Sequence, residues 1–449
     1  MWILLSTLFE LYICPMLLVY SEKITPRFRY IARLLLRDLL GQELRFTSDL
    51  EEYLQTTLPK INYSKNPLQS GIFIQASNLL FETDIFQQEF QVSKMEDITI
   101  FFLSGKHSVL PFDPFAASFF LVSRYEEYMP FIADEHNRFS AKESFMFKEG
   151  VLDQPLVNQY AELLGDVLEK FNPGIEIKKR EYKFINTVDI DNAYAYLGKG
   201  LVRNAGAYAK DLLNLRFGEM ADRTRTFLGM MKDPYETFEY QLSLQEKYGY
   251  ESIYFALFSK LGQYDRSLTM HSNRLHKYLK GINDFSEVAI HPSYRSNEHI
   301  SILEEELHRL EDVLNIDVTK SRQHFLKLSF PETYRNLIAL EITDDYTMGF
   351  AAESGFRAGI CTPFRFYDLE YETETPLIVH PFAFMDGTYI YYKGVSPKEA
   401  WKDIEKYIAT YRKYGGEFIP IWHNRIFSER EPEWKGWNHI FEKMVKAAV

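Results

Sequence analysis

Cysteine is scarce in this sequence. Only Cys14 and Cys361 occur among its 449 residues. Two cysteines so far apart provide neither a disulfide framework nor a thiolate metal cluster. This usage fits a reducing compartment, and any metal site must use other ligands.

Basic stretches, internal repeats and low-complexity segments are also missing. The formal net charge is −12, and no run of Lys and Arg offsets it. A nucleic-acid partner is therefore not expected, because such partners require a positive surface. The composition, 46% hydrophobic and 25% charged, is that of an ordinary globular protein long enough for two or three domains.

Long apolar runs are limited to the first 21 residues. This stretch lacks a basic start and a cleavage site for a signal peptide, contains Glu10 and Pro15, and is marginal as a membrane span. Met16 begins a run that reads as a strand followed by a helix. We therefore expect residues 1–15 to be an extension from a mis-chosen start, and the protein to be cytoplasmic without a stable membrane span. Export or anchoring through this segment is the alternative.

Two domains are predicted, with their boundary at the turn-forming triplet Asn172-Pro173-Gly174. Residues 1–175 form a smaller α/β accessory domain in which no catalytic group of residues stands out. Its expected strands are 17–20, 71–75 and 98–103, and its expected helices are 27–40, 114–128 and 156–171. Asp113 precedes Pro114 and is expected to cap the second of these helices.

Residues 176–449 alternate strand and helix patterns over a longer repeat. Such an alternation over about eight strands favours an irregular (β/α) barrel, which could be incomplete. The helix at 301–314 has a leucine stripe, and a capping box at Ser396–Glu399 begins another, which ends at Gly415. The expected strands are 184–188, 252–258, 287–290, 324–328, 346–351, 359–366, 376–380 and 417–421.

Polar side chains cluster near the predicted strand ends, where the active sites of such barrels lie. They are Asp189, Asp191, His291, Arg322, His324, Asp344, Asp345, Arg357 and His423. His380 is ambiguous, whereas His308 lies among glutamates on a helix and is expected at the surface.

The spacing of Asp189 and Asp191 has a chemical use. Side chains two residues apart in a β-strand point to the same side, so both carboxylates would lie on one side of the strand. Two like charges repel unless a cation or a proton lies between them. A divalent metal would let one Asp act as ligand and the other as general base. The alternative is that both aspartates cap the turn that follows.

These residues resemble the motifs of the polysaccharide deacetylases (NodB-like, carbohydrate esterase family 4). "TVDID" resembles the first motif, "IHPSY" falls at the metal-histidine motif, and "IWHN" resembles the last motif. The resemblance covers roughly residues 183–445. It implies a metal-dependent hydrolase that acts on carbon–nitrogen bonds and removes acetyl or other small N-acyl groups from an amino-sugar glycan.

The resemblance also implies roles for single residues. Asp189 would be the base and His423 the general acid. Asp191 and His291 would hold a divalent ion, and zinc is expected. The residue at the position of the family's third ligand is not a metal ligand here, and His324 is our first choice to replace it. Arg322 or Arg357 would orient Asp189. Tyr194, Tyr294 and Trp422 are neighbours of the motifs and could stack on a sugar ring.

Two departures from the family pattern leave other functions open. The family usually has adjacent aspartates, and its second metal histidine falls at Arg295 here. A cation cannot bind a metal, so a degenerate, non-catalytic carbohydrate-binding relative is the main alternative. A glycosidase that pairs Asp189 with Glu341, Asp344 or Asp345 is a third possibility.

Overall fold

The computed structural model describes residues 16–178 and 180–449, and its contacts divide the chain into two units. The first runs up to Leu121 and also includes Leu156–Arg180, while the second comprises Val122–Pro155 and Glu181–Val449. Residues 122–155 thus group with the second unit rather than with the segment that precedes the predicted boundary at 175. The predicted mis-start at residues 1–15 lies outside the described residues.

The first unit contains a parallel sheet of four strands in the order β2-β1-β3-β4. A separate antiparallel hairpin is formed by β5 and β6. Asp113 caps α3 as predicted, because its Oδ1 accepts hydrogen bonds from the backbone N–H groups of Phe115 and Ala116. The elements are β1 (Leu17–Tyr20), α1 (Pro26–Ala32), a π-helical turn (Arg33–Leu39), β2 (Leu44–Thr47), α2 (Leu50–Gln55), β3 (Lys60–Ser64), β4 (Ile72–Gln75), β5 (Val92–Met95), β6 (Ile98–Phe101), α3 (Pro114–Val122) and α5 (Leu156–Phe171).

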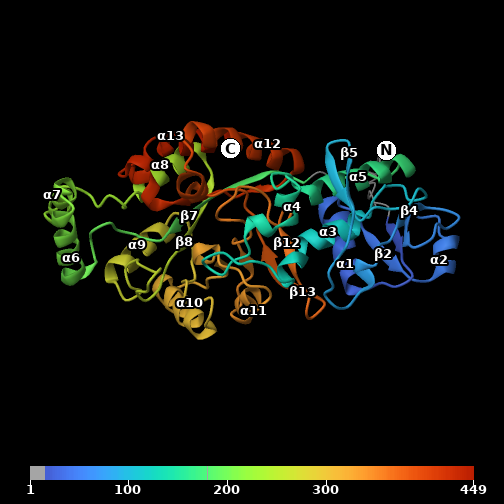
Figure 1. The fold of residues 1–449 in the computed structure, drawn as a ribbon, viewed down its shortest axis with the longest axis horizontal. Helices are drawn as coiled ribbons and strands as arrows, with labels where there is room; N and C mark the ends of the chain where they lie inside the picture. Colours follow the sequence, from blue (N-terminus) through green and yellow to red (C-terminus); the bar gives the residue numbers. More distant parts are fainter. Residues whose placement is uncertain (1–15, 179) are drawn as a thin grey trace, which may run out of the picture. The chain divides into compact units, whose positions relative to one another are not determined.

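A larger sheet of nine strands forms the centre of the second unit (Figure 1). Its order is β12-β13-β11-β10-β9-β8-β7-β14, and β15 also pairs with β7. All pairs are parallel except β12 with β13. The strands are β7 (Lys183–Ile190), β8 (Glu251–Ala256), β9 (Glu287–Ile290), β10 (Lys320–Ser321), β11 (Asp344–Asp345), β12 (Phe364–Asp368), β13 (Thr373–Val379), β14 (Glu417–Phe418) and β15 (Ile421–His423).

Helices separate most of these strands, as the alternating pattern predicts. The helix α12 begins with the predicted capping box of Ser396 and Glu399 and ends at Gly415, which has a φ of 62°. Nowhere in residues 16–178 and 180–449 is a helix both long and apolar enough to cross a membrane. The helices of this unit are α4 (Phe145–Lys148), α6 (Gly200–Leu213), α7 (Phe217–Phe227), α8 (Phe238–Tyr248), α9 (Asn273–Asn283), α10 (Ile300–Leu314), α11 (Glu332–Ala339), α12 (Pro397–Tyr414) and α13 (Trp437–Ala448).

The second unit has the mixed α/β architecture that was expected. Within the described residues, however, the order of strands in its sheet has two ends, so the strands do not form a closed barrel. One isolated parallel bridge joins Met385 to Ile421 beyond the end of β13. The closed form of the predicted barrel is therefore not found.

Two predicted strands are wrong. Residues 324–328 form a turn, because Phe325 and Leu326 have φ values of 61° and 53°, in the left-handed region that strands do not use. In the segment 346–351, two backbone carbonyl groups accept hydrogen bonds from arginine side chains and not from the backbone of a neighbouring strand. The Tyr346 carbonyl accepts from Arg322 Nε and the Gly349 carbonyl from Arg357 Nη1.

The pairing register brings the carboxyl ends of the parallel strands to one edge of the sheet. Asp189 of β7 lies opposite His423 of β15. Beyond β8 and β9, the N–H of His291 donates to the carbonyl of Ala256. The N–H of Arg322 donates in turn to the carbonyl of Ile290. Residues far apart in the sequence therefore meet at this edge.

Candidate metal centre and hydrolytic site

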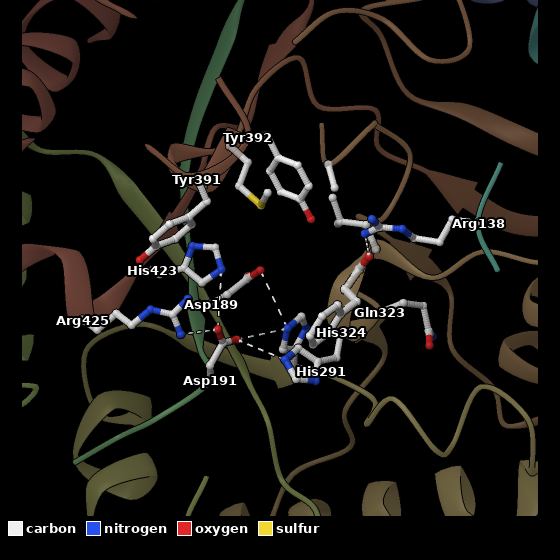
Figure 2. Close-up of a pocket in the computed structure, with 15 residues that line it drawn as sticks. Arg138, Asp189, Asp191, His291, Gln323, His324, Tyr391, Tyr392, His423 and Arg425 are labelled. Carbon is white, nitrogen blue, oxygen red and sulfur yellow. Dashed lines mark hydrogen bonds and ion pairs between the residues drawn. The ribbon is translucent and has the colours of Figure 1, made fainter. Parts of the chain in front are cut away.

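Asp189 and Asp191 stand at the carboxyl end of β7, on the same side of the strand (Figure 2). The side chain of Asp189 is 4% exposed and that of Asp191 is 12% exposed. Val188 and Ile190, which alternate with them, are buried in the core. The alternation predicted from the sequence thus directs two nearly buried carboxylates into one pocket.

Arg322 contacts the first of these aspartates. Its Nη1 donates to Asp189 Oδ1 at 2.7 Å, and its Nη2 donates to Thr187 Oγ1 at 2.9 Å. The guanidinium group also lies over the ring of Phe255. Arg322 is fully buried, so Asp189 is held in one position with Oδ2 left toward the pocket.

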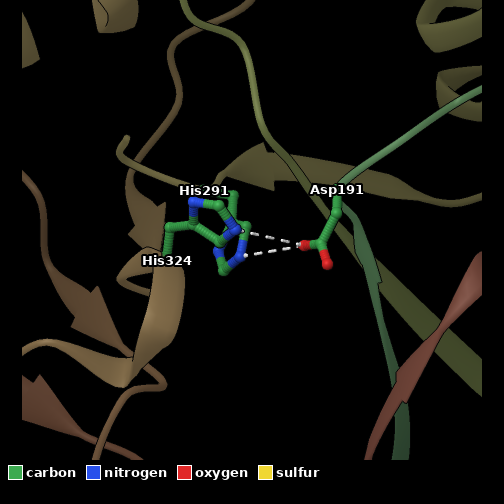
Figure 3. A group of neighbouring side chains, drawn as sticks. All are labelled: Asp191, His291 and His324. Carbon is green, nitrogen blue, oxygen red and sulfur yellow. Dashed lines mark ion pairs between the residues drawn. The ribbon is translucent and has the colours of Figure 1, made fainter. Parts of the chain in front are cut away.

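Two histidines face the second aspartate. The Nε2 atoms of His291 and His324 lie 3.6 and 3.8 Å from Asp191 Oδ1 (Figure 3). The three side chains offer ligand atoms that all lie within 4.8 Å of one another. Asp191 Oδ1 is buried and forms no hydrogen bond within residues 16–178 and 180–449. A buried carboxylate oxygen without a donor is costly in a protein unless another group completes its environment.

The other ring nitrogen of each histidine is already engaged. His291 Nδ1 contacts the carbonyl oxygen of Arg322, and His324 Nδ1 lies 2.9 Å from Asp265 Oδ1. Each Nδ1 therefore lies where it can donate to its oxygen partner, and Nε2 is the nitrogen of each ring that faces Asp191. Carboxylate or carbonyl support of this kind is what orients metal-binding histidines in proteins.

The second oxygen of Asp191 is bound by Arg425, whose Nη1 donates to Oδ2 at 2.8 Å. Burial alone would raise the pKa of Asp191, but the charges of His423 and Arg425 outweigh it and hold this pKa well below its usual value. Asp191 is therefore a carboxylate at any ordinary pH. One oxygen is hydrogen-bonded and the other is available to a cation.

His423 is the third histidine of the pocket. Its Nδ1 lies 2.6 Å from Asp386 Oδ1, and its backbone N–H donates to the other oxygen of Asp386 at 2.7 Å. Its Nε2 faces the pocket, 3.7 Å from Asp191 Oδ2. Burial lowers the pKa of His423, but Asp386 and Asp191 outweigh it and raise this pKa to about 9. The imidazole is therefore a proton donor near neutral pH.

Arg357 is not part of this group. Its Nε and Nη2 both donate to the carboxylate of Glu127, and the pair is buried. Of the two arginines proposed to orient Asp189, only Arg322 contacts it. Arg295, where the sequence resemblance led us to expect a second metal-binding histidine, is exposed. His324 lies beside His291 instead.

The glycosidase carboxylates also lie elsewhere. Asp345 Oδ2 accepts from Ser321 and Thr347, and Asp344 Oδ1 lies 2.8 Å from His380 Nε2. In the part of the chain that the structure describes, neither these residues nor Glu341 belongs to the residues that line the pocket. An acid pair across the mouth with Asp189 is thus not formed by them.

The pocket itself has a volume of about 210 Å³. Its wall includes residues that the sequence did not single out, among them Tyr391, Tyr392 and Arg425. Arg425 could have been noticed only as the second residue after His423. Tyr391 and Tyr392 are 48% and 45% exposed, whereas Trp422 of the sequence prediction is fully buried. Asp265 and Asp386 carry no sequence signal, because only the fold brings them to His324 and His423.

The N-terminal part of the chain matches a known family model, and the match includes residues 122–155 of the second unit. Residues 17–173 match a "Family of unknown function (DUF7033)". No curated protein matches the chain.

Solved structures resemble the chain weakly. A protein from Mycobacterium smegmatis assigned as a polysaccharide deacetylase is 16% identical, with a TM-score of 0.39 over 60% of this chain and 84% of that one. A probable polysaccharide deacetylase from Pseudomonas aeruginosa PAO1 is 11% identical, with a TM-score of 0.37 over 61% and 89%. A mutant CE4 family pseudoenzyme with restored enzymatic activity is 10% identical, with a TM-score of 0.29 over 60% and 64%. Likeness at this level does not establish a common activity.

Proposed function

We propose that this protein is a metal-dependent hydrolase that removes acetyl or another small N-acyl group from an amino-sugar glycan, on an irregular and incomplete (β/α) barrel. The observation that carries the proposal is the environment of Asp191 Oδ1. This buried oxygen lacks a hydrogen bond within residues 16–178 and 180–449 and faces two imidazole nitrogens. One carboxylate and two imidazoles form a common ligand set of catalytic zinc.

The residues present fit such an ion. Asp191, His291 and His324 would hold it, with Asp265 supporting His324 through Nδ1. A divalent cation at this site would supply Lewis acidity, which polarises an acyl carbonyl and acidifies water. Zinc is our expected ion because two of the three ligands are imidazoles.

Asp189 would act as the general base. Its Oδ1 is held by Arg322, and its Oδ2 lies 3.9 Å from His291 Nε2, at the edge of the proposed metal site. A proton taken from water at this edge would move to Oδ2. Arg322 would position the carboxylate through this hydrogen bond.

His423 would donate the second proton. Because Asp386 holds Nδ1, the proton on Nε2 points into the pocket, where the nitrogen of a leaving amine would need it. The rings of Tyr391 and Tyr392 stand at the open part of the pocket and can contact the apolar face of a sugar. Two aromatic rings that line the pocket and are partly exposed support a carbohydrate as the substrate.

Metal analysis of the purified protein tests the proposal, together with release of acetate from N-acetylated oligosaccharides. The parent should retain about one divalent ion per chain, and Asp191→Ala and His291→Ala should lose both the ion and the activity. His308→Ala, an exposed histidine of α10, is the matched control. The proposal would be wrong if the parent held no divalent ion when metal is supplied in excess, or if both variants bound the ion as the parent does.

A non-catalytic carbohydrate-binding protein is the second candidate. Arg425 favours it, because its hydrogen bond to Asp191 Oδ2 already brings a positive charge to the carboxylate. This candidate predicts that the parent binds oligosaccharides without releasing acetate, in the presence of any divalent ion.

A further inference from the structure

The helices α6 and α7 form a hairpin inserted between β7 and β8, directly after the strand that carries Asp189 and Asp191. Figure 1 shows the two helices side by side, joined to the sheet by extended segments (green). The hairpin contributes none of the residues that line the pocket described above. It therefore has no evident part in the proposed reaction.

Polar contacts hold the hairpin together. Arg223 of α7 donates to Asp211 of α6 at 2.7 Å, and both side chains are about 10% exposed or less. The hydroxyl groups of Tyr208 and Thr224 lie 2.8 Å apart. Arg430 also pairs with Glu219 at 2.8 Å and so attaches α7 to the rest of the unit. The inner side of this hairpin is thus built from charged and hydroxyl groups.

Its apolar side chains point outward instead. Leu201 is 91% exposed, Val202 87% and Leu213 84%. The other large apolar residues of the hairpin with high exposure are Leu212, Leu215, Phe217, Phe227, Leu228 and Met230. A cluster of this kind on a water-facing surface indicates that another apolar phase or molecule covers it.

The exposed apolar residues of α6 share one face. At about 100° per residue, Leu201, Val202, Leu212 and Leu213 fall within an arc of about 120°, which Ala205 and Ala209 complete. Lys210 falls about 60° beyond one edge of this arc, and the Arg203 guanidinium donates to the carbonyl groups of Arg266 and Ser267. The stretch 199–232 contains seven Lys and Arg against three Asp and Glu, in a chain whose net charge is −12. An exposed apolar face in a segment with an excess of cations is typical of helices that lie in a membrane interface.

We propose that the α6–α7 hairpin docks the protein on the surface of a membrane that contains anionic lipids. The leucine, valine and phenylalanine side chains would enter the headgroup region, and Lys210 and Arg216, both exposed, would contact lipid phosphates. A second copy of the chain fits less well, because two equal hairpins would bring their positive charges together. This inference does not depend on the proposed hydrolase activity.

Docking in this way would also orient the candidate active site. The hairpin leaves the sheet at the carboxyl end of β7, the edge at which Asp191, His291 and His324 meet. The membrane would then lie on the side of the sheet on which the pocket lies.

Sedimentation of the full-length protein with vesicles tests the inference. Vesicles of phosphatidylcholine with 30% phosphatidylglycerol are compared with vesicles of phosphatidylcholine alone. We expect binding to the anionic vesicles that weakens as salt is added, and an affinity at least about 10-fold lower for Leu201→Glu/Leu213→Glu. Ile132→Glu, at an apolar residue of the same unit that is 76% exposed, should bind as the parent does.

A local measurement separates the hairpin from every other segment that could touch lipid. Hydrogen–deuterium exchange should show that anionic vesicles protect peptides from residues 200–228 in the parent and not in the double variant. Unchanged exchange in these peptides, or equal vesicle binding by parent and double variant, would overturn the inference. So would self-association that the double variant abolishes while vesicle binding is absent, because the partner would then be a second copy.

Discussion

Arg322 donates a 2.7 Å hydrogen bond to Asp189, and both side chains are buried at the edge of the same sheet. The partners are 133 residues apart in the sequence. Another buried arginine of this unit, Arg357, makes a contact of the same kind with Glu127. The two pairs therefore offer a matched comparison between a contact in the pocket and one outside it.

The substitution Arg322→Lys should reduce acetate release by roughly 100-fold, because loss of the planar guanidinium leaves Asp189 Oδ1 without its fixed partner. The measurement is kcat on an N-acetylated oligosaccharide that the parent deacetylates, together with the melting temperature. Arg357→Lys should lower the melting temperature by a similar amount with little change in the kcat of the folded protein. Equal losses of kcat in both variants would contradict the positioning role of Arg322.

Asp265→Asn should weaken zinc binding by about 10-fold to 100-fold, because the amide supports the Nδ1 proton of His324 less well than a carboxylate does. Competition with a chromogenic chelator measures the affinity. Asp113→Asn, at a buried aspartate of the other unit, is the control and should bind zinc as the parent does. An unchanged affinity in Asp265→Asn would mean that His324 needs no such support.

Arg295→Ala should leave metal binding unchanged, since Arg295 is exposed and takes no part in the Asp191, His291 and His324 group. His324→Ala should abolish most of the binding. Isothermal titration with zinc distinguishes the two. If removal of Arg295 mattered and removal of His324 did not, the third ligand would lie on the segment that follows His291.

His380 lies between Asp344 and Glu417, with each ring nitrogen 2.8 Å from a carboxylate oxygen. Both nitrogens can donate only when the ring is a cation. Burial alone would lower the pKa of His380, but the hydrogen bonds to Asp344 and Glu417 outweigh it and raise this pKa above its usual value. A raised histidine pKa stabilises the folded state fully below the unfolded value of about 6.5, and this contribution is lost as the pH rises through the folded value.

His380→Gln should therefore destabilise the protein most at pH 6 and less at higher pH. Each unit by which folding raises the pKa corresponds to about 1.4 kcal/mol. Urea unfolding of parent and variant across pH 6 to 9 measures the difference. His308→Gln serves as the surface control. A difference between parent and His380→Gln that is constant across this range would show that folding does not raise the pKa of His380.

Local patterns were sufficient for several elements. The Leu stripe of α10, the capping box of α12 and the strand β7 depend on neighbours within a few residues, and all three were predicted. The strands expected at 324–328 and 346–351 failed for a different reason. The backbone of the first is bent, and carbonyl groups of the second accept hydrogen bonds from the side chains of Arg322 and Arg357.

The sequence by itself determined that two carboxylates, separated by one residue, leave the end of a buried strand on the same side. That follows from the period of a β-strand and needs no distant contact. Only the tertiary structure decided that Arg322 and not Arg357 contacts Asp189, and that His324 and not residue 295 stands beside His291. It also brought Asp265 and Asp386 to their histidines, and it turned the apolar face of α6 outward. Such choices depend on strand register and on packing between segments far apart in the chain, which local sequence patterns do not record.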